Sequence, residues 1–66
     1  MIQKYPDIEV KLVGEDGNAY AIIGRVRQAL RDHGVSKEEE TEFVRDATSG
    51  DYNHLLATVT DWVRIS

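Results

Sequence analysis

One strand pattern near the start of the chain, followed by helical patterns, limits the folds open to this sequence. Residues 7–13, DIEVKLV, alternate apolar and polar side chains and place Ile8, Val10 and Leu12 on one face. This period of two predicts a half-buried strand, with Pro6 marking its start. Because the residues that follow are typical of turns and helices, the strand has no partner until the chain nears its end.

The segment after this strand predicts a turn and then an amphipathic helix. Residues 14–18, GEDGN, are turn-forming, and Asn18 or Asp16 can accept a hydrogen bond from the free amide groups at the helix start. Between residues 19 and 33, six apolar side chains fall within an arc of about 120° when successive residues are turned by about 100°: Ala19, Ile22, Ile23, Val26, Ala29 and Leu30. Gly34 predicts a left-handed cap that ends this helix.

Two more helices are predicted, each from a start signal and an apolar face. Ser36 and Glu39 match the S-x-x-E capping box. Gly50 separates this second helix from a third, which Ser49 or Asp51 can cap. The expected buried positions are Phe43, Val44 and Ala47 in the second helix and Tyr52, Leu55, Leu56 and Val59 in the third.

The last residues decide how the first strand is paired. Residues 61–66, DWVRIS, fit either a longer third helix or a closing strand with Val63 and Ile65 facing inward. Their β-branched side chains and the unpartnered first strand favour the closing strand. We therefore expect one α+β domain over residues 1–66, with the order β-α-α-α-β and the N- and C-terminal strands paired.

The size of the chain favours self-association. A chain of 66 residues buries only roughly 60% of its unfolded surface. It has no cysteine, so neither a disulfide nor a thiolate metal site adds stability. A two-stranded sheet is marginal in water and its open edges favour further pairing, so a homo-oligomer is expected.

Charge and hydropathy bear on partners and compartment. Eight basic and twelve acidic residues give a net charge of −4, which argues against general nucleic-acid binding. The charge is uneven, because residues 19–34 are net basic and residues 35–47 are net acidic. The start of the chain does not resemble a signal peptide, and no run is long enough to span a bilayer, so a cytoplasmic protein is expected.

The glycines of residues 13–27, VGEDGNAYAIIGRVR, match neither G-x-G-x-x-G nor G-x-x-x-x-G-K-[ST]. A nucleotide-binding loop is therefore not expected there. Gly24 is unusual for another reason, because glycine inside a helix lowers helix stability by up to about 1 kcal/mol relative to alanine. It shares a helix stripe with Tyr20, Arg27 and Arg31, at spacings i, i+4, i+7 and i+11.

Two interpretations of this stripe stay open. In one, the missing side chain of Gly24 lets another helix approach, most simply across a symmetric dimer. In the other, Tyr20 stacks on a base while Arg27 and Arg31 hold phosphates. The two are compatible if the groove lies between subunits, where Trp62 is the first choice for an interface aromatic. Additional candidate ligand contacts come from Asn18, Ser49 and Asp51.

No catalytic or metal-binding set is expected. Ser49, Asp51 and His54 lie too close along one helix start to build a hydrolytic triad, and helix capping explains them. His33 is typical of a buried or cap-proximal histidine at a helix C-terminus. The sequence therefore predicts a protein that is not an enzyme and that uses neither a cofactor nor a metal ion.

Two segments, GNAYAIIGRVRQALRDHG and FVRDATSGDYNHLLATVTDWV, together resemble a set of short proteins of bacteriophages and other mobile elements. The shared features are a glycine-asparagine helix start, an internal helix glycine and an SGDY-x-HLL segment. The resemblance implies a small phage-type protein that acts in the host cytoplasm. It supplies no catalytic or binding residues.

Three functions are weighed on this basis. The leading hypothesis is a non-enzymatic oligomer that sequesters an anionic nucleotide-like ligand, such as a signalling nucleotide of host defence. The first alternative is an acidic protein-protein interaction module that regulates a host or phage enzyme. The second is a nucleic-acid-binding regulator that uses Arg25, Arg27 and Arg31. The module would act through the carboxylates of the second helix, which are expected to be solvated at its start: Glu38, Glu39, Glu40 and Glu42.

Overall fold

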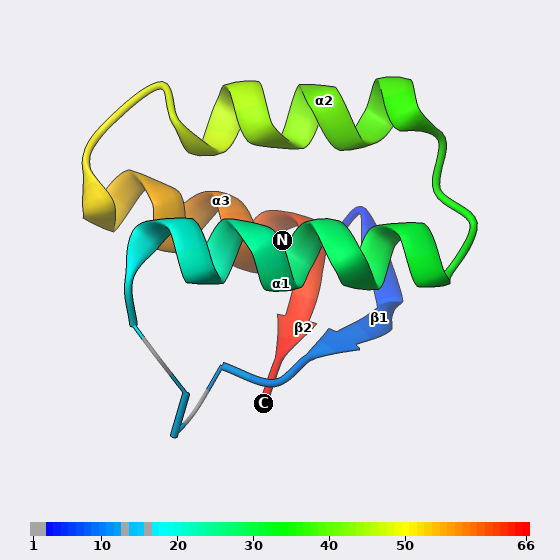
Figure 1. The fold of residues 1–66 in the computed structure, drawn as a ribbon, viewed down its shortest axis with the longest axis horizontal. Helices are drawn as coiled ribbons and strands as arrows, with labels where there is room; N and C mark the ends of the chain where they lie inside the picture. The colour runs from blue at the N-terminus through cyan, green and yellow to red at the C-terminus, as the bar shows by residue number, and fades with distance from the viewer. Residues whose placement is uncertain (1–2, 13, 16) are drawn as a thin grey trace.

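A computed structural model describes residues 3–12, 14–15 and 17–66 and confirms the expected α+β architecture. The helices α1 and α2 run side by side, α3 lies behind α1, and the strands lie together on one side of the helices (Figure 1). In chain order the elements are β1 (Tyr5–Val10), α1 (Ala19–Asp32), α2 (Lys37–Ala47), α3 (Tyr52–Trp62) and β2 (Val63–Ile65).

The two strands pair in parallel, with Tyr5 opposite Val63 and Val10 opposite Ile65. A parallel pair needs a long crossover connection, which here consists of all three helices. β1 spans residues 5–10 rather than 7–13; it therefore begins before Pro6, and Val13 lies outside the described residues. The register is irregular between residues 5 and 9, a segment that contains a proline with no N–H to donate.

The C-terminal segment combines both of its expected conformations. α3 continues to Trp62, and the closing strand follows at once as Val63–Ile65. Two backbone hydrogen bonds extend the pairing beyond the strand ends, from the Ser66 N–H to the Val10 carbonyl at 3.0 Å and from the Leu12 N–H to the Ser66 carbonyl at 2.9 Å. The pairing of the two ends is therefore continuous past β2.

Side-chain caps fix the starts of the helices. Asn18 Oδ1 accepts a hydrogen bond from the Tyr20 N–H at 2.8 Å, and Asp16, the other candidate cap, lies outside the described residues. Ser36 Oγ accepts from the Glu39 N–H at 3.2 Å, which confirms that half of the capping box. Gly34, with φ of 77°, is the predicted left-handed residue that follows α1.

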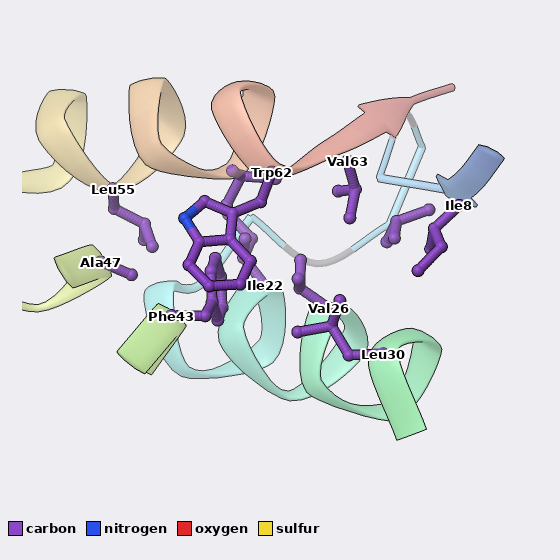
Figure 2. Packing of buried hydrophobic residues seen from close by; sticks show 11 residues of the cluster. Ile8, Ile22, Val26, Leu30, Phe43, Ala47, Leu55, Trp62 and Val63 are labelled. Atoms are coloured by element: carbon purple, nitrogen blue, oxygen red, sulfur yellow. The ribbon is translucent and has the colours of Figure 1, made fainter. Parts of the chain in front are cut away.

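The core lies where the three helices meet the sheet. Trp62 occupies its centre, with the Phe43 ring edge-on at 5.4 Å between centroids (Figure 2). All three helices and both strands contribute, with these buried apolar residues: Ile8, Val10, Ile22, Val26, Leu30, Phe43, Ala47, Leu55, Val59, Trp62 and Val63.

Two aromatic positions of α3 differ from expectation. Tyr52 was predicted to face inward but is 45% exposed, because it sits in the first turn of α3. Trp62 was the candidate interface aromatic, and only 6% of it is exposed. Tyr5 packs beside its ring at 5.9 Å between centroids, and Lys4 Nζ lies 4.3 Å from the ring centroid. Trp62 is therefore a core residue with little surface left for a partner.

Among residues 3–12, 14–15 and 17–66, none of the helices has the length and apolar character needed to cross a bilayer.

Candidate functional site

Two arginines of α1 converge on one carboxylate of α2. Arg27 Nε donates to Glu40 Oε1 at 2.8 Å, and Arg31 Nε donates to Glu40 Oε2 at 3.0 Å. Arg31 Nη2 also lies 3.0 Å from Glu40 Oε1. Arg27 and Arg31 are four residues apart, so they lie one above the other on the same helix face. We call this cluster, Arg27, Arg31 and Glu40, the ion triad.

Burial is unequal within the ion triad. The Glu40 side chain is 6% exposed, whereas those of Arg27 and Arg31 are 43% and 55% exposed. Hydrogen bonds from Arg31 and then Arg27 lower the pKa of Glu40 below its ordinary value, against the opposing effect of burial. Glu40 is thus a fixed negative charge, and both guanidinium groups keep one side in solvent.

The expectation that the carboxylates of α2 are all solvated is wrong for Glu40. It is buried together with Phe43 and Ala47, at the spacing i, i+3 and i+7 of one helix face. Sequence reasoning missed this position because it grouped Glu40 with its charged neighbours. The helical period and the basic stripe on the preceding helix were the available signals.

An open groove of about 270 Å³ lies at the other end of the α1 stripe. Tyr20 stands beside it with 85% of its surface exposed, and Tyr52 forms part of the wall. The Tyr52 hydroxyl donates to the Gly17 carbonyl and ties α3 to the segment before α1. The groove lining combines apolar and polar groups: Ala19, Tyr20, Ile23, Ala47, Thr48, Gly50, Asp51, Tyr52 and Leu55.

The groove and the ion triad lie along one seam between α1 and α2. A smaller hollow of about 150 Å³ adjoins the ion triad and is lined by Arg27, Glu40, Thr41 and Val44. Tyr20 and Arg27 are seven residues apart, which is about 10 Å along a helix. An aromatic surface and a basic surface therefore stand at opposite ends of a short stretch of α1.

Gly24 lies on α1 between these two ends. No heavy atom of the described residues comes within 4 Å of a Cβ built at this position, apart from its neighbours on the helix, and its φ is not positive. The packing and backbone of the described chain therefore do not require glycine there. A side chain at this position would project into the space between Tyr20 and Arg27.

Three further candidates act in local structure. Asn18 and Asp51 are the N-caps of α1 and α3, and the Asp51 cap is the 2.9 Å bond from the His54 N–H to its Oδ1. The Ser49 hydroxyl donates to the Asp46 carbonyl at 2.7 Å, and its own N–H donates to the same carbonyl at 3.2 Å. Of these three, the structure places Asp51 in the groove lining.

The residues around His54 do not form a nucleophile and base. His54 Nε2 lies 2.9 Å from the Asp46 carbonyl, which can only accept, so Nε2 carries a proton. The same N–H can then also donate to Ser49 Oγ, which lies 3.0 Å from Nε2. At the end of α1, His33 Nδ1 donates to the Ala29 carbonyl at 2.9 Å, as expected of a cap-proximal histidine.

Charged residues outside the seam are also paired. Arg25 Nη2 lies 3.5 Å from Glu15 Oε1. Lys4 Nζ lies 2.8 Å from Glu39 Oε2, and this hydrogen bond raises the pKa of Lys4. Over the residues that the structure describes, no group of three or more histidine, aspartate or glutamate side chains is placed to hold a metal ion.

The architecture is thus that of a small α+β domain with three helices inserted between two parallel strands. Comparisons with protein-family models, with curated proteins and with solved structures each return no match.

Proposed function

We propose that this is a non-enzymatic binding protein that takes a flat, anionic, nucleotide-like ligand along the seam. One observation carries the proposal. The exposed Tyr20 ring, the open position of Gly24 and the half-exposed guanidinium groups follow one another along the exposed edge of α1 beside α2. Their separation of about 10 Å suits a ligand with a ring system at one end and a phosphate at the other.

The chemistry of each end supports this ligand class. An exposed tyrosine ring offers a large, rigid surface on which a base can stack, with a contribution of about 1–3 kcal/mol per base. Each guanidinium has five N–H donors in a fixed planar geometry that matches phosphate oxygens. Glu40 engages Nε of Arg27 together with Nε and Nη2 of Arg31, and the exposed sides of both groups face solvent.

Self-association and the phage resemblance extend the proposal. The exposed stripe of α1 also leaves room for a second copy on the far side of the ligand, so the ligand would lie between subunits of a homo-oligomer. A phage-type protein of this kind would act by sequestering a signalling nucleotide of host defence in the host cytoplasm.

The two alternative functions receive less support from the ion pairs of the charged residues. An acidic module would use the carboxylates of α2, yet Glu39 is engaged by Lys4 and Glu40 by the ion triad. A nucleic-acid-binding regulator would use the three arginines of α1, and each of these has an acidic partner on this chain. The module would then rest on the exposed Glu38 and Glu42, and the regulator would have to hold a polyanion on the outer N–H groups of these arginines against a net charge of −4.

Isothermal titration calorimetry tests the proposal. Purified protein is titrated with cyclic dinucleotides, cyclic ADP-ribose isomers and AMP, and saturable binding of at least one is expected. Tyr20→Ala should weaken the binding by about 5- to 150-fold without altering the fold, because Tyr20 is 85% exposed. Asn53→Ala, at an exposed position of α3, is the matched control. Absence of binding to all of these ligands at high micromolar concentration would refute the proposal.

A further inference from the structure

Glu40 joins α1 and α2, and its buried carboxylate also fixes the positions of two arginine side chains. Its carboxylate is buried and receives hydrogen bonds from both arginines, and removing either partner would leave a buried charge less compensated. Arg27 and Arg31 are consequently held side by side, with the remaining N–H groups directed away from Glu40. A ligand meets a fixed pair of guanidinium groups rather than two mobile side chains.

The ion triad also has a definite net charge. Two guanidinium groups and one carboxylate leave a single positive charge at this end of the seam. The groove at the other end adds the negative Asp51, and the chain as a whole carries −4. One negative charge on a ligand is therefore matched, while each additional one meets a negative surface.

We infer that Glu40 is a positioning residue that makes the seam selective for a phosphodiester, which carries a single negative charge, over nucleotides with several. The inference rests on the proposed function and specifies its ligand class. The ligand is a base or base-like ring joined to a phosphodiester, with the ring on Tyr20 and the diester oxygens on the outer N–H groups of Arg27 and Arg31.

A charge series at constant ionic strength tests this selectivity. The probes are the dinucleoside phosphate ApA, AMP and ATP, which share adenine and differ in charge, and their affinities are measured by titration calorimetry. Wild-type protein is expected to bind ApA at least about tenfold more tightly than ATP, a difference of about 1.4 kcal/mol. Binding of ATP as tight as that of ApA would overturn the inference while leaving the proposed function standing.

Substitution of Glu40 separates a positioning role from a purely structural one. In Glu40→Gln the local charge rises, so the preference is expected to move from ApA towards ATP, a change that a loss of stability alone would not produce. Glu42→Gln, exposed on the same helix, should keep the wild-type order. An unchanged order in folded Glu40→Gln contradicts the inference, and the wild-type series decides it if that variant does not fold.

A nucleic acid strand shares the phosphodiester chemistry, so one arm of the experiment uses a single strand of about ten nucleotides. If the strand binds no more tightly than ApA, the result supports a small ligand. If the affinity rises strongly with strand length, the assignment of a small ligand is wrong. If none of the probes binds, the proposed function itself fails, which is a different result from a wrong order of affinities.

Discussion

Gly50 and Gly24 show two different reasons for a glycine in this small domain. A Cβ built at Gly50 would lie 2.8 Å from His54 Cγ and 2.9 Å from His54 Cβ, closer than real atoms approach, whereas one at Gly24 would meet nothing within 4 Å among the described residues. At Gly50, between α2 and α3, the His54 side chain occupies the space that a Cβ would need. The outer stripe of α1 is left open, and the fold gives no reason for that.

The largest effect is expected in the hydrophobic core, where the packing of the described residues leaves no open space. Phe43 is fully buried and packs edge-on against Trp62, so Phe43→Ala should lower the free energy of unfolding by about 3–5 kcal/mol. Urea denaturation measures this loss. Val44→Ala, at a half-buried position one residue on, is the control and should lose clearly less.

Gly50→Ala tests whether the corner between α2 and α3 tolerates one added methyl group. The new Cβ would overlap the His54 side chain, so a loss of about 1–3 kcal/mol in unfolding free energy is expected. In a His54→Ala background the loss should shrink, because the ring atoms that crowd the site are gone. The His54 Cβ, 2.9 Å away, remains in that background, so part of the loss should persist, and equal losses in both backgrounds would show that the ring is not the cause.

Gly24→Ala should change stability in the opposite direction. Alanine favours the helix by up to about 1 kcal/mol relative to glycine, and the added methyl group has open space, so the melting temperature should rise. A fall in stability that depends on protein concentration would instead show that a second copy packs closely against this position.

Acidification gives the smallest expected effect, because solvent screens the half-exposed arginines. The arginines lower the pKa of Glu40 in the folded state, so this carboxylate stabilises the fold fully above the ordinary carboxyl pKa of about 4.3. That contribution is lost as the pH falls through the lower folded-state pKa.

The measurement is the difference in unfolding free energy between wild type and Glu40→Gln, followed from neutral to acidic pH. The difference should narrow as the pH falls. A constant difference would mean that the Glu40 charge has no part in stability, and Glu42→Gln serves as the control for carboxylates that are exposed.

The signals that were local in sequence predicted the fold well. α1 begins at the predicted Ala19 and ends at Asp32, because Asn18 and Gly34 are caps that act over a few residues. The bounds of β1 were displaced because they depend on pairing with β2, at the far end of the chain. The burial of Trp62, the candidate interface aromatic, depends in the same way on residues from other elements, Phe43 and Tyr5.

The candidate site could be predicted in part. The spacing of Tyr20, Arg27 and Arg31 placed them on one helix face, and the structure has them along one side of α1 towards α2. The role of Glu40 depends on how α2 docks on α1, which no spacing within α1 specifies. The helical period marks Glu40 as a core-facing position, but its two arginine partners follow only from this docking.

Gly24→Leu tests most directly whether the exposed stripe of α1 is kept open for a ligand and not for the fold. Leucine also favours the helix, and its side chain would fill the space between Tyr20 and Arg27. Calorimetric titration with ApA and a melting curve are recorded for this variant and for Ala57→Leu, an exposed control on α3. Gly24→Leu is expected to have a higher melting temperature and to lose ApA binding, whereas Ala57→Leu should keep ApA binding. Unchanged ApA affinity in Gly24→Leu would show that the ligand does not need the open position.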